Sequence, residues 1–228
     1  VSIILPTYNE EGNIERLINK ISKILGNQKY EIVIVDDDSR DKTSEIINKH
    51  SKSSKVVGVH RYGKRGIFSA ILDGVKACSG EFIMIMDSDF SHPPELIPYL
   101  ISYSNEYDVV SGSRFLRRSG IEAPFLRKYG TIMLNIFCKI ILGLKPKDLT
   151  GGFHIIKKDK FNQLNFKYKT IWGEFDMEFF WRASQKKFTI KEVPFIYKFR
   201  EEGTSKSENL LKYGYIYAKR ALQLRFFR

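Results

Sequence analysis

The feature that most constrains the fold is a regular alternation in the first half of the chain. Short apolar runs alternate there with stretches in which apolar residues recur at helical spacing. This alternation is typical of βαβ units built around a mostly parallel sheet with helices on both faces. We therefore predict an α/β fold whose early strands lie at residues 1–5, 31–35, 56–59, 82–86 and 108–111.

The helices between these strands follow from the same pattern. Apolar residues at helical spacing predict helices over 14–25, through 46–47, over 67–77 and over 93–100. Ser39 and Asp41 are candidate caps for the second of these helices. Pro93-Pro94 opens the last one, since proline suits the first turn of a helix.

The second half of the chain is less regular. A loop rich in Arg and Gly spans residues 113–124, and Gly151-Gly152 interrupts the chain before a short strand. The sequence contains no internal repeat and no linker long enough to separate independent domains, so we predict one domain over residues 1–228. The elements predicted for this half are helices at 127–142, 174–186 and 207–227 and strands at 153–156 and 189–197.

Composition narrows the class of protein. Hydrophobic residues make up 43% of the 228 and charged residues 28%, the balance of a soluble globular protein. Lys and Arg number 38 against 26 Asp and Glu, and the net charge of +12 favours nucleic acid, a lipid surface or phosphorylated small molecules as partners. Cys78 and Cys138 are too few and too far apart for a disulfide scaffold, which predicts ordinary thiols in a reducing compartment.

Two stretches bear on membranes. A spanning helix needs about 20 apolar residues, and residues 132–144 are fewer and are interrupted by Asn135 and Lys139. Because no secretory signal is visible either, we expect that the chain does not cross a membrane by itself. This stretch and the tail are amphipathic, which suits either interfacial helices or packing onto the sheet. Their apolar faces consist of Met133, Ile136, Phe137, Ile140 and Ile141, and of Leu210, Tyr213, Tyr217, Ala221 and Leu224.

Three polar clusters follow predicted strands of the first half. Residues 6–10 read Pro-Thr-Tyr-Asn-Glu, residues 36–39 read Asp-Asp-Asp-Ser, and residues 87–89 read Asp-Ser-Asp. In open α/β sheets, ligands bind outside the carboxyl ends of the strands. We therefore expect the three clusters to meet in one crevice.

The carboxylates in this crevice suggest a metal. Asp87 and Asp89, two positions apart on an extended strand end, can project to the same side and share a hard cation. The clusters contain several carboxylates and no His or Cys. Such a set of ligands suits Mg²⁺ or Mn²⁺ better than zinc. The acidic cluster at 36–39 or the one at 87–89, taken alone, could equally be a set of solvated turn residues that cap the next helix. Together they favour a site, because each follows an apolar strand.

The order and spacing of several motifs resemble a known enzyme family. The chain is similar to the inverting glycosyltransferases of the GT-A fold, family 2, and within it to the polyprenyl-phosphate glycosyltransferases, of which dolichyl-phosphate mannose synthase is the best known. The likeness runs from Val1 to about Lys206. The motifs that carry it are the three clusters above, Lys64-Arg65-Gly66 before a helix, Phe90-Ser91-His92-Pro93-Pro94-Glu95, Gly112-Ser113-Arg114 and Thr150-Gly151-Gly152-Phe153.

The resemblance implies a role for particular residues. It implies a nucleotide-binding half over 1–112, an acceptor-side half over 113–206 and an amphipathic helix over 207–228. Asp89, Asp87 and Arg114 would be catalytic, and Asp87, Asp89 and Ser91 would form the metal shell. The nucleotide would contact Pro6, Tyr8, Glu10, Val35, Asp36, Asp38, Lys64, Asp87 and Ser88. Cationic groups for the donor and acceptor phosphates would be Arg114, Arg127, Arg200 and Lys206.

The implied reaction transfers a sugar, with inversion, to a polyprenyl or dolichyl phosphate at the cytosolic face of a membrane, by a peripheral enzyme or one anchored by segments outside this sequence. GDP-mannose is the first choice of donor and UDP-glucose the second. An acceptor phosphate is already a nucleophile at neutral pH, whereas a hydroxyl acceptor would need a base, for which Asp148 and Asp89 are candidates. Family members commonly carry Gln at the position of Ser91 and often Lys near that of Glu174, so metal preference and sugar selection stay open.

Two other functions remain as alternatives. A family 2 transferase that acts on a glycan or protein hydroxyl is one of them, although residues 223–226 do not match the Gln-x-x-Arg-Trp motif of processive synthases. An RNA-binding module is the other, but such a protein clusters its basic and aromatic side chains on one surface. Here the aromatic residues lie inside apolar runs and the crevice is lined with carboxylates, so we expect no nucleic-acid partner.

Overall fold

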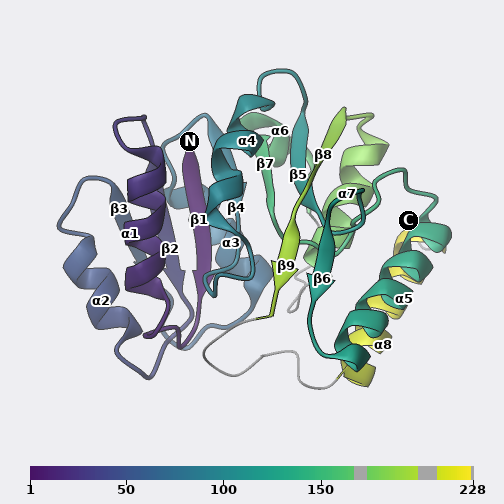
Figure 1. Cartoon of the computed structure of the whole chain (residues 1–228), viewed down its shortest axis with the longest axis horizontal. Coiled ribbons are helices and arrows are strands. Elements are labelled where there is room, and N and C mark those ends of the chain that lie inside the picture. Colours follow the sequence, from purple (N-terminus) through teal and green to yellow (C-terminus); the bar gives the residue numbers. More distant parts are fainter. Residues whose placement is uncertain (167–173, 200–209, 227–228) are drawn as a thin grey trace.

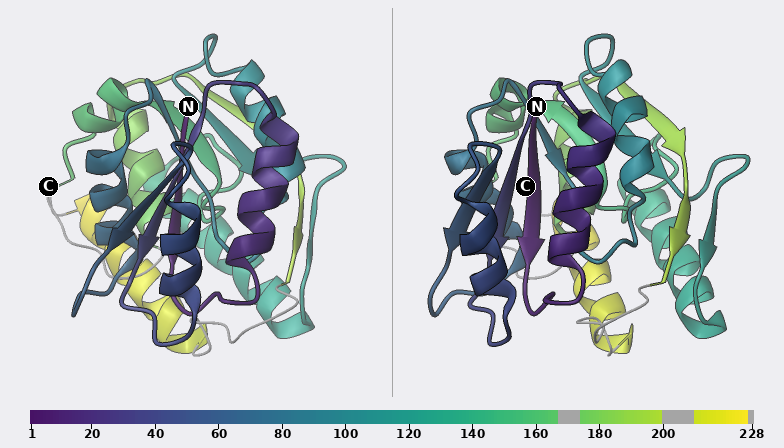
Figure 2. Two further views of the ribbon diagram at one scale, coloured as in Figure 1. Left: turned by 90° about the vertical axis from the view of Figure 1, so that its left-hand side faces the viewer. Right: turned by 60° about the vertical axis from the view of Figure 1, so that its left-hand side comes forward.

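The computed structural model describes residues 1–166, 174–199 and 210–226, which form one seven-stranded sheet, a small two-stranded sheet and helices on both faces (Figures 1 and 2). The main sheet has the order β3-β2-β1-β4-β7-β5-β8. Its strands are β1 (Ser2–Thr7), β2 (Glu31–Asp36), β3 (Val56–His60), β4 (Phe82–Ile85), β5 (Val109–Ser113), β7 (His154–Lys157) and β8 (Ile190–Pro194). The helices are α1 (Ile14–Leu25), α2 (Thr43–His50), α3 (Ile67–Ala77), α4 (Ile97–Ser102), α5 (Phe125–Leu142), α6 (Lys158–Gln163), α7 (Phe175–Gln185) and α8 (Leu210–Phe226).

The first four strands are parallel to one another, and β1, β2 and β4 are buried on both faces. Successive residues of β1 point to opposite sides, so that Ile4 joins the core beneath α3, α7 and α8 while Ile3 and Leu5 join the core beneath α1 and α4. Gly74 lets α3 approach this sheet closely, because a Cβ there would lie 2.6 Å from Cγ2 of Ile4. This part of the chain confirms the predicted βαβ pattern.

β7 runs antiparallel to both of its neighbours, β4 and β5. Ile85, the last residue of β4, is paired with His154, the first residue of β7. The carboxyl end of β4 therefore lies beside the amino end of β7, which brings Thr150-Gly151-Gly152 next to the acidic triplet at residues 87–89. The sheet is thus mixed and mostly parallel, as the predicted fold class requires.

The strand predicted over 189–197 is wrong in one respect, because it divides at Phe195. β8 pairs with β5 in the main sheet, whereas β9 (Ile196–Lys198) pairs with β6 (Gly120–Glu122) in the small sheet. At the break, Phe195 N donates to Ser113 O and Phe195 O accepts from Gly120 N, so this one residue bonds to both partners. β6 lies where only a loop was expected, and α6 was not predicted.

Two smaller differences concern helix starts. The predicted helix 93–100 consists of a 3₁₀ turn (Pro94–Leu96) followed by α4. α2 begins at Thr43, whose N–H donates to Oδ1 of Asp41 at 3.0 Å, while Ser39 bonds elsewhere. Among the described residues, no helix is both long enough and apolar enough to span a bilayer.

The tail helix α8 packs along α5 and against α7 (Figure 1). Tyr217, Ala221 and Leu224 are buried in the core, so packing is the correct alternative for this face. A buried carboxylate at Glu178 of α7 fixes the helix: Nε and Nη2 of Arg220 donate to its Oε2 at 2.9 and 2.6 Å. Arg182 donates to the other oxygen of Glu178 at 2.7 Å.

Candidate active site

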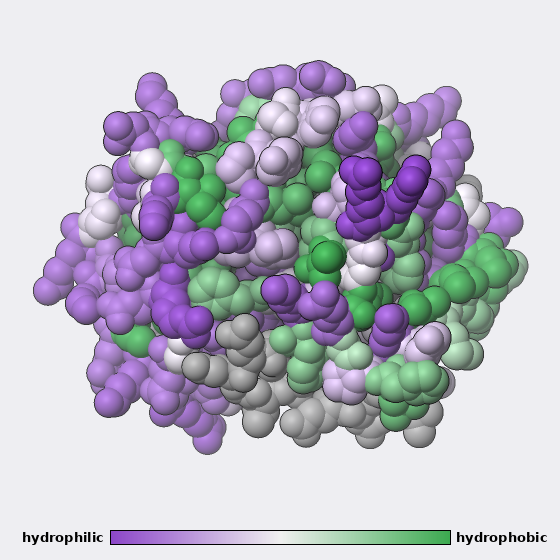
Figure 3. All heavy atoms as spheres, in the orientation of Figure 1, coloured by the Kyte–Doolittle hydropathy of each residue, from purple (hydrophilic) through white to green (hydrophobic). Residues whose placement is uncertain are grey.

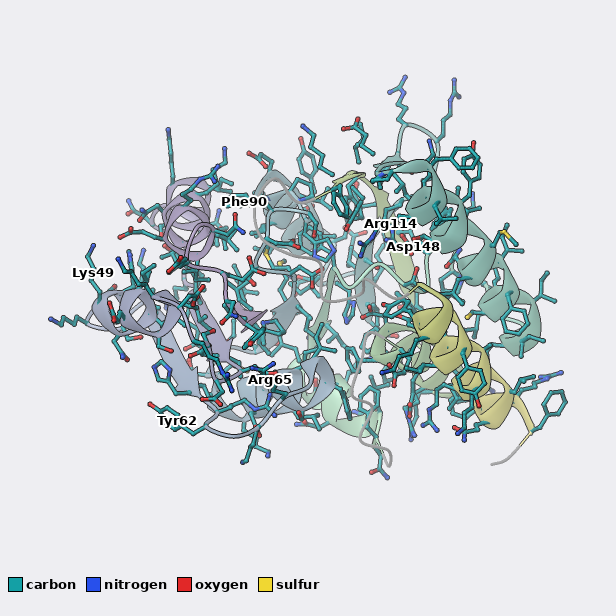
Figure 4. The ribbon with its side chains drawn as sticks, turned by 90° about the horizontal axis from the view of Figure 1, so that it is seen from below. Lys49, Tyr62, Arg65, Phe90, Arg114 and Asp148 are labelled. Carbon is teal, nitrogen blue, oxygen red and sulfur yellow. The ribbon has the colours of Figure 1, made fainter. Side chains whose placement is uncertain are left out.

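The carboxyl ends of β1, β2 and β4 meet at one edge of the sheet, the edge that Figure 4 views from below. The loop after each of these strands contains a non-glycine residue in the left-handed region: Asn9 (φ 51°), Asp38 (φ 61°) and Phe90 (φ 63°). Such residues are uncommon and cost energy, and they concentrate at functional sites. Three of the six described non-glycine residues with positive φ therefore lie at the edge that the polar clusters predict, and the other three are Arg118, Asn165 and Lys187.

Hydrogen bonds lock the first two loops together. The backbone N–H of Asn9 donates to Oγ of Ser39 at 2.9 Å, and Oδ1 of Asn9 accepts from the N–H of Arg40 at 2.9 Å. Glu10 N–H donates to Oγ1 of Thr43 at 2.8 Å. The loops after β1 and β2 thus form one unit.

The three consecutive aspartates after β2 have different environments. Asp36 is buried and accepts the hydroxyls of Ser39 and Ser44, each at 2.5 Å. Asp37 pairs with Arg61 and accepts the N–H of Gly66 at 2.8 Å. Within the described part of the chain, no residue forms a hydrogen bond or ion pair with Asp38. Of the three, Asp38 is therefore the carboxylate best placed to receive a ligand.

The other predicted nucleotide contacts differ in how accessible they are. Arg65 lies over the ring of Tyr8, with 3.9 Å between its guanidinium carbon and the ring centroid, and donates to the Tyr8 hydroxyl at 2.5 Å (Figure 4). Lys64 is exposed beside them. Val35 is fully buried in the core, so only its backbone could face a ligand.

Glu10 is also buried, although it was expected in the nucleotide pocket. Its Oε2 accepts a hydrogen bond from Nδ2 of Asn13 at 2.7 Å. This contact closes the first turn of the segment that leads into α1. The carboxylate is placed to support the loop after β1 from within.

At the end of β4, the acidic triplet is held from two sides. Ser88 donates through Oγ to the carbonyl of Pro6 at 3.2 Å, which joins the ends of β4 and β1. Asp89 is buried, and its Oδ1 accepts the N–H of Ser91 at 3.1 Å. The Asp87 side chain is 43% exposed and lines a cavity.

These residues fit a hard divalent cation. Mg²⁺ is commonly bound through one or two carboxylates with substrate phosphates and water completing the shell. Asp87 and Asp89 supply that pair, and the buried hydroxyl of Ser91 has no hydrogen-bond partner within the described part of the chain. The described residues contain no cluster of three or more His, Cys, Asp or Glu that could hold a metal without further ligands. A cation there would therefore depend on the phosphates of a bound substrate.

The cavity has a volume of about 100 Å³ and joins the sheet edge to three helices. Asp87, Thr150, Gly151, Gly152 and Asp176 form its polar lining. The rest of its wall is apolar or aromatic: Pro6, Ile67, Ile71, Ile85, Phe175 and Tyr213. A lining with both polar and apolar groups suits a small ligand with both kinds of surface.

Asp176 is a site residue that sequence reasoning did not identify. It is buried on α7, and that burial, with the charges of Asp87 and Asp148, raises its pKa well above the usual value. A raised pKa favours the protonated form of a carboxyl, which can donate a hydrogen bond. The available signal was that Asp176 and Glu178 interrupt an aromatic helix in which acids would otherwise be costly to bury.

Arg114 and Asp148 form a buried pair beside the cavity (Figure 4). Nε and Nη2 of Arg114 donate to the two carboxylate oxygens of Asp148 at 2.7 and 2.8 Å, and Nη2 also donates to Oγ1 of Thr150 at 2.7 Å. Burial would raise the pKa of Asp148, but the charge and hydrogen bonds of Arg114 outweigh it and hold that pKa below the usual value. Asp148 therefore supports the Thr150-Gly151-Gly152 loop and is unsuited to act as a free base.

The remaining predicted phosphate ligands are placed only in part. Arg127 lies in the first turns of α5, with 4.9 Å between its guanidinium carbon and the ring centroid of Phe199. Arg200 and Lys206 lie outside the described residues. The phosphate-binding roles of all four cations, Arg114 included, stay predictions.

α5 presents an apolar surface outward. Seven large side chains on it are exposed, by 37% to 76%, and they form what we call the α5 stripe: Phe125, Leu126, Tyr129, Met133, Ile136, Phe137 and Ile140. Figure 3 shows an apolar patch at the right-hand edge, where α5 lies in Figure 1. Asn135 faces inward instead, where its side chain bonds Lys147 O at 2.6 Å and the N–H of Leu149 at 2.8 Å. Packing therefore does not cover Met133, Ile136, Phe137 and Ile140 of the predicted face, whereas Ile141 packs partly against the core.

Comparison with solved structures defines the class of fold. Glucosyl-3-phosphoglycerate synthase from Mycobacterium tuberculosis, solved with Mn²⁺, uridine diphosphate and glucosyl-3-phosphoglycerate, matches 98% of this chain and 78% of its own with a TM-score of 0.71. At 18% identity this likeness concerns the fold alone. The predicted GT-A fold is confirmed.

The family follows from sequence. Residues 2–164 match the model of glycosyl transferase family 2, so the chain belongs to this family of glycosyltransferases. It is 36% identical to a dolichol-phosphate mannosyltransferase of Pyrococcus furiosus over 95% of this chain, and spans 61% of that protein's length. A dolichol-phosphate mannosyltransferase of Mycosarcoma maydis is 26% identical over 94% of this chain and 76% of its own.

A third relative carries a different sugar in its name. An undecaprenyl-phosphate 4-deoxy-4-formamido-L-arabinose transferase of Yersinia enterocolitica is 36% identical over 65% of this chain and 46% of its own. The predicted family is therefore confirmed, and these relatives share a polyprenyl phosphate in their names.

Proposed function

We propose that this glycosyltransferase moves a sugar, with inversion, from a nucleotide donor to a polyprenyl or dolichyl phosphate. The observation that carries the proposal is the carboxylate pair Asp87 and Asp89 beside a cavity at the carboxyl edge of a family 2 sheet. GDP-mannose is the proposed donor, because two of the three relatives above are named as mannosyltransferases. UDP-glucose is the second candidate.

In this proposal the donor binds across the ends of β1, β2 and β4. Asp38 and the Tyr8–Arg65 pair receive the nucleoside, because these side chains come from loops after β1, β2 and β3 and are not buried. Asp87 and Asp89 face the diphosphate with Mg²⁺ or Mn²⁺, which when bound would neutralise the negative charge that develops on the leaving group. The buried Asp89 is held by Ser91 N–H and keeps its geometry before the donor arrives.

The acceptor phosphate supplies the nucleophile. One of its oxygens attacks the anomeric carbon opposite the diphosphate, so that the new carbon–oxygen bond forms as the bond to the diphosphate breaks. No proton has to be removed, because the phosphate is already ionised at neutral pH. Bringing two anions together costs electrostatic energy that cationic side chains offset, and Arg127 at the start of α5 is the described candidate for this task.

The side chains around the cavity favour a phosphate over a hydroxyl acceptor. A hydroxyl would need a general base, but Asp148 is bonded through both oxygens to Arg114. The raised pKa of Asp176 favours the protonated form of that carboxyl, which cannot accept a proton. Asp89 would then have to serve both as base and as metal ligand.

The α5 stripe supports a lipid acceptor. Aromatic and aliphatic side chains on one face of a helix, with lysines nearby, suit the boundary between lipid headgroups and acyl chains. We propose that this surface rests on the cytosolic face of a membrane and brings the cavity to the phosphate of the lipid. Apolar side chains exposed by up to 76% are otherwise costly to leave in water.

One assay tests the proposal. The protein is incubated with dolichyl phosphate and labelled GDP-mannose or UDP-glucose, with Mn²⁺ or with EDTA, and the organic phase is analysed for labelled glycolipid. We expect a Mn²⁺-dependent product, more from GDP-mannose than from UDP-glucose. No product from either donor with metal and lipid present would refute the lipid-phosphate acceptor.

A variant separates metal binding from folding. Asp89→Asn keeps the size of the side chain but removes its charge, and we expect loss of product at an unchanged melting temperature. Full activity of Asp89→Asn would refute the metal assignment. Arg117→Ala, in the exposed loop before β6, is the matched control and should retain product.

A further inference from the structure

Asn135, on the inner face of α5, has no part in the reaction described so far. The residue is 2% exposed, unlike the α5 stripe on the outer face of the same helix. Its side chain uses both polar atoms on one short segment of backbone. Nδ2 donates to the carbonyl of Lys147 at 2.6 Å, and Oδ1 accepts the N–H of Leu149 at 2.8 Å. Asn135 therefore holds the backbone on both sides of Asp148.

A second element holds the same segment. Glu192 on β8 accepts the N–H of Lys147 at 2.9 Å through Oε2 and the N–H of Asp148 at 3.0 Å through Oε1. Four hydrogen bonds to two side chains thus fix the three consecutive residues 147–149. Buried backbone groups outside helices and strands need partners of this kind. The segment is therefore clamped between α5 and β8.

The clamped segment sets one wall of the cavity through Asp148, which is fully buried. Oδ1 of Asp148 accepts the N–H of Thr150 at 3.2 Å, and the carboxylate also holds Arg114. Gly151 packs on the same carboxylate, since a Cβ there would lie 3.2 Å from Oδ2 of Asp148. Thr150, Gly151 and Gly152 line the cavity. A shift of Asp148 would therefore shift this wall.

The wall has little spare space in which to absorb such a shift. A Cβ on Gly152 would lie 3.3 Å from Cε1 of His92 and 3.4 Å from Oδ2 of Asp176. Gly152 also has φ +68°, a conformation that other residues rarely adopt. Because the cavity has a volume of about 100 Å³, a small displacement of the wall changes the room that a ligand finds.

We propose that Asn135 is a positioning residue: it holds the backbone on both sides of Asp148 and thereby places the Thr150-Gly151-Gly152 wall for the donor. The inference rests on the proposed function, and it takes the cavity beside Asp87 as the place of the transferred sugar. A misplacement of about 1 Å caused far from the reacting atoms can lower the rate about 100-fold. α5 then carries the α5 stripe on its outer face and supports the site from its inner face.

Two variants and a control separate positioning from packing. Asn135→Ala removes both hydrogen bonds to residues 147 and 149. Asn135→Asp keeps the shape of the side chain and the acceptor for Leu149 N–H, but places an oxygen against the carbonyl of Lys147. Leu142→Ala, on the same buried face of α5, removes packing but no hydrogen bond to the clamped segment.

The first measurement is hydrogen exchange of backbone amides, which needs no activity. We expect residues 147–152 of Asn135→Ala to exchange about 10-fold faster or more, relative to β1 of the same protein, because this segment opens locally. Leu142→Ala should lower the melting temperature and leave that ratio unchanged.

Turnover gives the second measurement. We expect kcat for glycolipid formation to fall by about 10- to 100-fold in Asn135→Ala, and by a smaller factor in Asn135→Asp. The Kd for GDP with Mn²⁺ should stay within about two-fold, because the proposed nucleoside site lies on the loops after β1, β2 and β3. A merely structural role would lower the melting temperature and leave kcat of the folded protein unchanged, as we expect for Leu142→Ala.

The outcomes separate the inference from the function on which it rests. If folded Asn135→Ala retains kcat, or if Leu142→Ala loses as much, the inference is overturned while the proposed function stands. If Asn135→Ala does not fold, Asn135→Asp decides by the same measurements. If neither folds, Asn135 serves the fold alone and the inference is overturned. If the unaltered protein forms no glycolipid, the proposed function fails, and the inference fails with it.

Discussion

The two halves of the molecule bury different kinds of side chain. Inside β1, β2 and β4 the buried residues are almost all Ile, Val, Leu and Met, and buried charges occur at the strand ends. In the second half, buried polar groups lie within the elements themselves. They include Asn135 in α5, His154 in β7, Glu178 in α7 and Arg220 in α8.

The difference shows two ways in which buried side chains determine where strands and helices lie. Strands with aliphatic side chains are held by buried apolar area and close packing. Their parallel arrangement follows from the alternation of strands and helices along the chain. α5, α7 and α8 are held in position by buried polar side chains that bond to particular partners. A buried polar group without a partner costs free energy. The second half, which holds the α5 stripe and contributes part of the cavity wall, is thus built around specific bonds.

The largest effect is expected where a buried ion pair is broken. Glu178→Gln removes the charge that faces Arg182 and Arg220, and loss of one partner of a buried pair typically costs about 3–5 kcal/mol. We expect the free energy of unfolding, measured with urea, to fall by that amount. Glu95→Gln, in the exposed pair with Lys20, is the control and should change it little. Equal effects of the two variants would contradict the comparison.

A cavity in the first half should cost slightly less. Ile4→Ala removes three carbons from the face of β1 that packs against Gly74 of α3. Substitutions of this kind destabilise by about 2–5 kcal/mol. Urea unfolding measures the loss, and Ile24→Ala, on a partly buried position of α1, should cost clearly less. A loss below that of the Ile24 variant would show that close packing of this face matters less than we infer.

The third prediction uses pH. His154 is fully buried, neither ring nitrogen has a partner within the described part of the chain, and burial lowers its pKa from 6.5 to about 3. Between these values the unfolded chain binds a proton that the folded protein does not, so stability is lost as the pH falls below about 6.5. The expected loss from this group is about 1.4 kcal/mol per pH unit, or about 2 kcal/mol at pH 5.

His154→Phe tests this assignment, because a phenyl ring can retain the stack on Phe179, whose centroid is 4.1 Å away. Urea unfolding of both proteins between pH 7 and pH 4.5 should give a shallower decline for the variant. Parallel curves would show that His154 does not carry the pH dependence.

The smallest effect on stability is expected on the α5 stripe. Met133→Ser with Ile140→Ser changes two side chains exposed by 70% and 73%, and such surface changes usually stay within about 0.5 kcal/mol. Sedimentation with vesicles of anionic phospholipid should nevertheless show weaker binding. Leu224→Ala on α8 is the matched opposite, which should lower stability and leave vesicle binding of the folded protein unchanged. Retained vesicle binding by the double variant would refute the membrane role of the stripe.

The first half was predictable because periodicity and burial agree there. Each apolar run became a strand, and each acidic cluster came to lie at the edge where parallel strands end. The environment of each carboxylate was not predictable from the sequence. Asp36, Asp37 and Asp38 are adjacent, and they differ only in the hydrogen-bond and ion-pair partners that folding brings to them. The same limit applies to Asp148, which became a partner of Arg114 across 34 residues.

The second half was harder because its amphipathic patterns have two possible orientations. The apolar faces of α5 and α8 look alike in sequence, yet one is exposed and the other is buried. In α5 the side chain of Asn135 determines which face points inward, because it bonds to the backbone of residues 147 and 149. The periodicity of apolar residues does not reveal these hydrogen bonds. Asp176 was identified as lining the cavity only once α7 was placed beside the ends of β1 and β4.

The position of β7 has a consequence for how the molecule is made. As the chain leaves the ribosome, β1 to β4 can associate early, but the far edge of β4 stays open until residues 154–157 have been synthesised. An open edge of an apolar strand is a template for wrong pairing with other chains. Pairing across a long intervening segment is also slow, because the loop must close first. β7, which places Thr150-Gly151-Gly152 beside the acidic triplet, is thus also the strand that covers this open edge of β4.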